Sequence, residues 1–105
     1  MARRSKDFNE TLFELLKDPQ EAAAYLNEHL EYEGNDKETL FLKALRKVAL
    51  AQGFDEIVAK AQLQRRGLEK ALSEKGNPRF STLTALLEAL GLRVSIEVKD
   101  GKKAS

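Results

Sequence analysis

The apolar residues recur every three to four positions through most of the chain, a spacing that predicts amphipathic helices. After a basic arm at 1–7, a short apolar stretch at 8–16 has roughly this spacing. Longer periodic segments predict helices over 19–31, 37–51, 56–61 and 65–74, and a last helix between Ser81 and Gly91. The pattern therefore predicts an all-α protein of five helices with an N-terminal helical extension, and one exception near the C-terminal end.

The exception is the segment 92–98, where the period falls from 3.6 residues to two. The apolar Leu92, Val94, Ile96 and Val98 alternate with polar residues, which predicts a short, half-buried β-strand. A lone strand leaves its backbone groups unpaired. We therefore expect it to pair with its counterpart in a homodimer or with the sheet edge of a partner protein; the dimer is favoured, and a tail packed on the last helix is the remaining alternative.

Residues that favour helix ends mark most of the boundaries. Asp18 followed by Pro19 is a start signal, because Asp caps free backbone N–H groups and proline is tolerated at the first helical position. The run 35–38, Asn-Asp-Lys-Glu, is a second start signal, and Asp55 is expected to cap the helix at 56–61. Gly53 is the expected stop of the helix before it.

The charged residues are unevenly distributed. The net charge is +1, yet residues 7–40 hold ten acidic residues against two lysines, while residues 60–80 hold six basic residues against two glutamates. The asymmetry predicts a basic surface for a polyanion and an acidic one, which suits a basic protein or is simply a solvated helix that completes the core. We divide the chain into 1–34 (arm and acidic extension), 35–91 (helical domain) and 92–105 (strand and polar tail).

Several classes of function have no support in the composition. The chain has no cysteine, so disulfides and cysteine-ligated zinc are excluded. His29 is the only histidine and is interpreted as a surface residue, because one histidine with scattered glutamates makes no metal site. Ser73 and Ser81 lack a neighbouring histidine that would activate them. We therefore expect no enzyme, no cofactor and no small-molecule substrate; no membrane span or secretory signal is visible, which favours the cytoplasm.

Two short helices joined by a tight turn are the pattern of a helix-turn-helix. The turn would be 62–64, with Leu63 pointing into the core, and the second helix would start at Arg65. On that helix Leu68, Ala71 and Leu72 share one side, which leaves the polar residues on the other. The expected DNA-binding residues are Gln64, Arg65, Arg66, Glu69, Lys70, Lys75 and Arg79.

These residues have different expected roles. A helix in the major groove of double-stranded DNA meets base edges with its N-terminal residues. Arg65 and Arg66 could bind guanine and Gln64 adenine, with each bidentate contact contributing roughly 1–3 kcal/mol of discrimination. Lys70, Lys75 and Arg79 are better placed for phosphates, which add affinity and salt dependence.

Several runs of residues point to a known family. They are 71–78 (Ala-Leu-Ser-Glu-Lys-Gly-Asn-Pro), 81–83 (Ser-Thr-Leu) and 86–95, with 24–28 and 41–45 upstream. In these runs, and over about 8–98, the chain resembles the probable addiction-module antidote proteins, HigA-like antitoxins with a lambda-repressor-like (XRE) helix-turn-helix. The resemblance implies an antitoxin that neutralises a RelE/HigB-like ribonuclease toxin and represses its own operon, usually as a dimer.

Three positions depart from the family pattern. Gln62 stands where the family has glycine at the turn, which predicts a reshaped turn. Gln64 replaces a serine that would cap the second helix, and Glu56 replaces a glutamine that commonly meets a phosphate. Glu56 and the altered turn leave a helical protein-interaction module without DNA binding as one alternative function. A stand-alone repressor with no toxin partner is the other.

Overall fold

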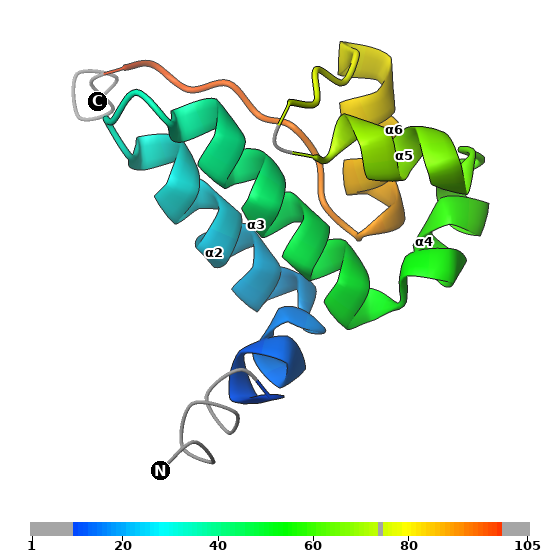
Figure 1. Cartoon of the computed structure of the whole chain (residues 1–105). Helices are drawn as coiled ribbons and strands as arrows, with labels where there is room; N and C mark the ends of the chain where they lie inside the picture. The colour runs from blue at the N-terminus through cyan, green and yellow to red at the C-terminus, as the bar shows by residue number, and fades with distance from the viewer. Residues whose placement is uncertain (1–9, 74, 100–105) are drawn as a thin grey trace, which may run out of the picture.

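The structure, a computed structural model, describes residues 10–73 and 75–99. Within these ranges it holds six helical segments and no β-strand (Figure 1). Residues 10–16 are helical and are followed by α2 (Pro19–Glu31), α3 (Lys37–Gln52), α4 (Phe54–Ala61), α5 (Arg65–Ala71) and α6 (Phe80–Ala89). The all-α class agrees with the prediction, but the architecture of five helices with a C-terminal strand is wrong.

The predicted start of α2 is observed. The Asp18 side chain accepts a hydrogen bond from the backbone N–H of Gln20 at 2.9 Å, and Pro19 occupies the first helical position. This cap satisfies one N–H that has no partner inside the helix. The bounds of α2 therefore match the expected 19–31.

Other helix boundaries differ from the prediction. Helix α4 begins at Phe54, with Gly53 at its N-cap, so Asp55 lies inside the first turn and does not cap the helix. Helix α6 begins at Phe80, one residue before the predicted cap Ser81, and its N-cap makes no side-chain hydrogen bond. Helix α5 ends at Ala71, because Leu72 already has non-helical backbone angles.

The core surrounds α3 and joins both halves of the chain. Leu45 and Val48 of α3 and Leu86 of α6 are completely buried. From the N-terminal region, Leu16 and Ala22 belong to the same core cluster. Helix α2 packs on α3, while α4 packs on α3, α5 and α6, so α2 and α5 lie at opposite ends of the molecule (Figure 1).

The segment after α6 is extended but is not a strand. Gly91 ends α6 with a φ of +86°, a backbone conformation that favours glycine, and the N–H of Leu92 donates to the carbonyl of Leu87 at 2.8 Å. Residues 93–98 then make no backbone hydrogen bond within the described chain. A β-strand requires a paired neighbour, and no other described segment is extended beside this one.

Candidate DNA-binding surface

Helices α4 and α5 and the turn between them form the predicted helix-turn-helix. Leu68 and Leu72 attach α5 to the core with 2% and 1% of their surface exposed, and Leu63 in the turn is half-buried against the same cluster. The opposite side of α5 is exposed. Its polar residues therefore face solvent on a helix whose position is fixed by apolar contacts.

The turn keeps a left-handed residue although glycine is missing. Gln62 has φ 58° and ψ 42°, and its N–H donates to the carbonyl of Ala59 at 3.1 Å. The N–H of Leu63 donates to the carbonyl of Val58, also at 3.1 Å. The tight turn is therefore preserved at the conformational cost of a side chain in the left-handed region, roughly 1–2 kcal/mol.

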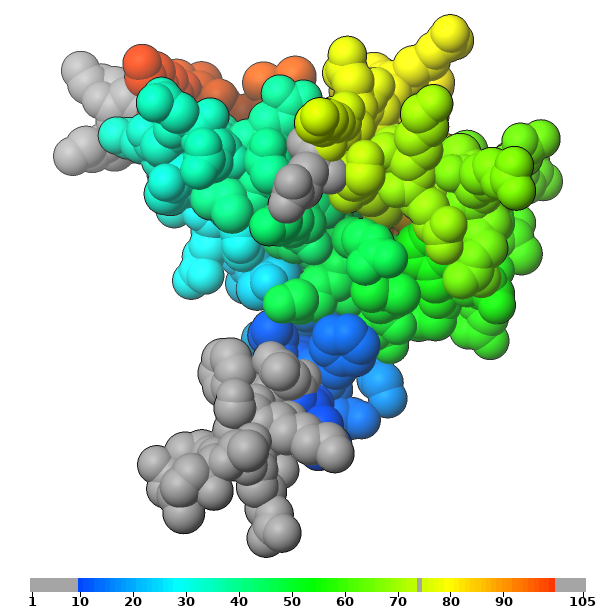
Figure 2. Space-filling model, in the orientation of Figure 1, coloured from blue at the N-terminus to red at the C-terminus, as the bar shows by residue number. Residues whose placement is uncertain are grey.

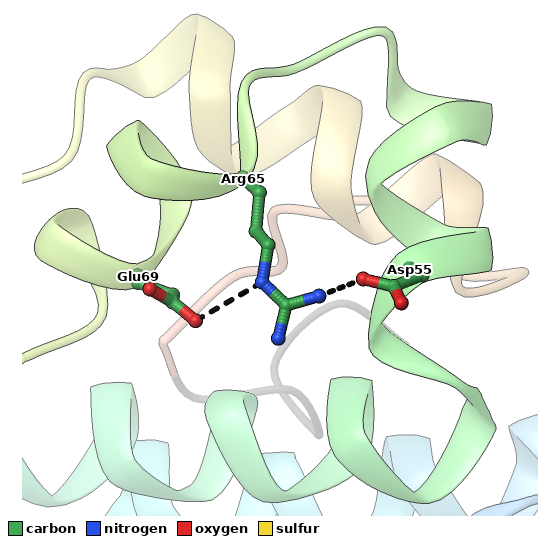
Figure 3. Close-up of polar contacts among 3 residues, drawn as sticks. All are labelled: Asp55, Arg65 and Glu69. Carbon is green, nitrogen blue, oxygen red and sulfur yellow. Dashed lines mark hydrogen bonds and ion pairs between the residues drawn. The ribbon is translucent and has the colours of Figure 1, made fainter.

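The Arg65 side chain forms ion pairs with two carboxylates of the same chain. Its guanidinium lies between Asp55 of α4 and Glu69 one turn further along α5 (Figure 3). The Arg65 Nε atom is 3.2 Å from a Glu69 carboxylate oxygen, and the guanidinium carbon is 5.2 Å from the centre of the Phe54 ring. Of the predicted DNA-binding residues, Arg65 and Glu69 thus pair with each other, and Arg65 also pairs with Asp55 of α4.

Arg66 and Lys70 have a different environment. Both are exposed, and neither side chain makes a hydrogen bond or ion pair with any residue in the described ranges. They lie four residues apart on α5, one turn of the helix, and therefore project from the same side. These two cations are available to a ligand in a way that Arg65 is not.

Gln64 and Arg79 are brought together although they are 15 positions apart. Both line a shallow cleft of about 270 Å³ between α5 and the start of α6. Gln64 occupies the N-cap of α5 with extended backbone angles and makes no side-chain cap, as expected from the missing serine. Lys75 is exposed in the loop before α6.

Two residues of this surface were missed by the sequence analysis. The sequence predicts Asp55 to be a helix cap, whereas in the structure it forms an ion pair with Arg65. Gly67 lies in the middle of α5, where glycine is unfavourable by about 1 kcal/mol relative to alanine; a Cβ there would have no neighbour within 4 Å. Packing therefore does not require glycine at this position. A glycine inside a short helix is unfavourable, and this was the feature of the sequence that could have drawn attention to Gly67.

The acidic residues of α2 lie far from this surface. Glu21 and Glu28 are exposed on α2, seven positions apart and hence on one side of the helix. Figure 2 shows the cyan residues of α2 on the left of the molecule and the yellow-green residues of α5 on the right. The two charged surfaces predicted from the sequence are spatially separate.

His29 is half-buried rather than fully on the surface. Its Nδ1–H donates to the carbonyl of Tyr25 at 2.8 Å, and the two rings meet edge to face. Burial raises the pKa of the Tyr25 hydroxyl. Among the described residues no group of three or more potential ligands could hold a metal ion, and no helix is long and apolar enough to cross a bilayer.

Comparisons with known proteins match nearly the whole chain. A family model described as "Probable addiction module antidote protein" matches residues 5–98. A protein of Haemophilus influenzae, described as uncharacterized, is 37% identical over 97 residues, which cover 92% of this chain and 95% of that protein. No solved structure matches the chain.

Proposed function

The chain belongs to the family of probable addiction module antidote proteins, as its sequence motifs predicted, and we propose that it is the antitoxin of a type II toxin–antitoxin module. An antidote acts on a toxin, so a toxin is its partner. We propose further that this toxin is a RelE/HigB-like ribonuclease and that the antitoxin binds its own operator, as a homodimer in the cytoplasm, to repress the operon.

One observation carries the operator-binding part of the proposal. Arg66 and Lys70 project together from the exposed side of α5, with no partner in the described chain. An α-helix fits the width of the major groove, and two free cations complement the negative charge of DNA. Leu68 and Leu72 hold α5 in a fixed position for this contact. Arg66 is the residue that we propose to read a guanine, and Lys70 the one that contacts a phosphate.

The acidic surface of α2 supports the toxin-binding part. A ribonuclease must carry basic groups to hold RNA, and an acidic surface complements such groups and accelerates association. Helix α2, which carries the exposed Glu21 and Glu28, lies at the opposite end of the molecule from α5 (Figure 1). One molecule could therefore bind toxin and DNA at the same time, as a co-repressor complex requires.

Operator binding is tested by fluorescence anisotropy on the DNA upstream of the gene and on a scrambled duplex, at two salt concentrations. The native protein should prefer the upstream DNA, with a steep decrease in affinity as salt increases. Arg66→Ala should lose the preference, since one bidentate contact contributes roughly 1–3 kcal/mol. Arg46→Ala, which removes the same charge from an exposed position on α3, should keep it; equal effects of both variants would refute base reading by Arg66.

A further inference from the structure

Residues 93–98 form an exposed extended edge whose apolar side is largely uncovered. Val94, Ile96 and Val98 are 46, 93 and 62% exposed, and only Leu92 at the start of the segment packs on the core. The backbone of 93–98 has no partner in the described chain. An edge of this kind is the surface to which another extended chain adds as a strand.

The segment also borders an apolar groove. The groove has a volume of about 790 Å³, and its other walls come mainly from α2 and α6. Leu30 of α2 and Phe80 of α6 line it and remain 48 and 70% exposed. In Figure 1 the segment runs from the end of α6 back toward the turn between α2 and α3, and its residues Arg93, Val94, Ser95 and Glu97 line one side of the groove.

We infer that this surface holds the same segment of a second copy, paired antiparallel about Ser95. In that register each Arg93 lies opposite the Glu97 of the other copy, which gives two symmetric pairs of opposite charge. On the other side of the ribbon Val94 lies opposite Ile96, and Leu92 opposite Val98. When two copies of residues 92–98 run antiparallel in this register, opposite charges face each other and apolar residues face apolar residues.

The neighbouring registers lack this complementarity. A shift that pairs even with odd positions would place every apolar side chain opposite a polar one. Pairing about Ile96 would place Arg93 opposite Lys99 and repel. Pairing about Val94 would leave Val98 beyond the end of the ribbon, opposite Leu90, which is buried in the core. One register therefore satisfies both faces.

This pairing specifies the homodimer of the proposed function, and its meaning for operator binding rests on that function. A two-fold axis at Ser95 relates two α5 helices, as two operator half-sites about 34 Å apart require. The pairing itself can be tested without DNA or toxin. The edge of a toxin's sheet is the competing occupant, and it predicts a protein that is monomeric when alone.

Charge exchange in the full-length protein tests the register. Arg93→Glu places like charges opposite each other in both symmetric pairs, and should raise the dimer dissociation constant about tenfold in sedimentation equilibrium. Glu97→Arg should do the same, and the double variant should return the dissociation constant to the native value. Both side chains are exposed, so each variant should fold; its circular dichroism spectrum is the check. A monomeric native protein, or a double variant as weak as the single ones, would overturn the inference.

Disulfide formation tests the symmetry independently, because the chain has no cysteine of its own. Residues directly opposite each other across an antiparallel pair have Cα atoms about 4.5–5.5 Å apart, within reach of a disulfide. Ser95→Cys should therefore form an interchain disulfide under mild oxidation. In Lys99→Cys, the matched control, the two sulfur-bearing residues would lie eight positions apart along the ribbon, about 27 Å, and should not cross-link.

The outcomes separate this inference from the proposed function. Cross-linking of both cysteine variants, or of neither, would refute pairing about Ser95 even if operator binding is observed. A Ser95 cross-link without operator preference would leave the pairing standing and refute the proposed DNA-binding role. The two proposals can therefore fail separately.

Discussion

The left-handed Gln62 allows a quantitative test of how the turn tolerates the loss of glycine. Gln62→Gly should stabilise the protein, because glycine adopts φ 58° without the steric cost of a Cβ atom, roughly 1–2 kcal/mol. The flexibility that glycine adds to the unfolded chain opposes this gain by about 0.4–1 kcal/mol. The Gln62 side chain is exposed and makes no hydrogen bond with the described residues, so no side-chain hydrogen bond is lost. The net expectation is a stabilisation of about 0.5–1 kcal/mol.

Thermal unfolding followed by circular dichroism measures this effect. For a domain of this size, the expected stabilisation corresponds to an increase in Tm of about 3–6 °C. Gln62→Ala is the matched control, since it removes the same side-chain atoms but keeps the Cβ, and it should not raise the Tm. Gln62→Asn should fall between them, because asparagine tolerates the left-handed region better than most residues. An alanine variant as stable as the glycine variant would refute the backbone explanation.

The remaining predictions concern the DNA-facing helix and the acidic surface. Gly67→Ala should stabilise the protein by about 1 kcal/mol and therefore raise its Tm. It should also weaken operator binding if DNA approaches the α5 backbone closely. A large loss of stability would contradict the open space around Gly67. Arg65→Ala should lower stability by about 1 kcal/mol, less at high salt because its ion pairs are exposed; unfolding at low and high salt measures this, and a loss independent of salt would argue against ion pairing. Glu21→Lys with Glu28→Lys should reduce affinity for the proposed basic toxin at least about tenfold in calorimetry. The control is Glu88→Lys on α6, and equal losses would remove α2 as the binding surface.

The sequence alone would suggest testing toxin binding by deleting the N-terminal acidic segment. The two charge reversals on α2 are a better test. Removing the acidic extension up to residue 34 would also remove Leu16, Ala22 and Leu26, which are 1, 0 and 4% exposed in the common core. Such a truncation would unfold the protein, because lost core side chains destabilise by about 2–5 kcal/mol each. Exposed glutamates can be reversed without that consequence. The functional question about α2 therefore requires charge variants.

Helix boundaries were predictable where a local signal and the tertiary structure agree. Asp18 and Pro19 determine the start of α2 through contacts within four residues of each other, so the sequence contains the whole cause. Helix α4 begins two residues before its expected start, because Phe54 is drawn into the core with 7% of its surface exposed. That burial depends on residues distant in sequence. The Asp55 side chain, free of any capping role, then meets Arg65 ten positions away.

The sequence is sufficient to predict which residues lie on the candidate DNA-binding surface. It is not sufficient to predict which of them are free to contact DNA. Helical periodicity is sufficient to place Arg65 and Arg66 outside the core, and both are exposed. Which of them is free depends on the distance between α4 and α5, since only the packed pair brings Asp55 to Arg65. The proximity of Gln64 and Arg79 has the same origin, because α6 must pack on α4 before the two residues share a cleft.

The C-terminal segment shows why period two is weaker evidence within one chain than period 3.6. A helix satisfies its backbone hydrogen bonds internally, so a helical pattern predicts a structure that the segment can form alone. A strand satisfies them only through a neighbour, so the same kind of pattern predicts a structure conditional on a partner. In this chain every other described element is helical or a turn, and no described segment pairs with the backbone of 93–98. The alternation therefore predicts an intermolecular contact, and the charges at Arg93 and Glu97, which oppose each other about Ser95, specify a second copy of the chain as that partner.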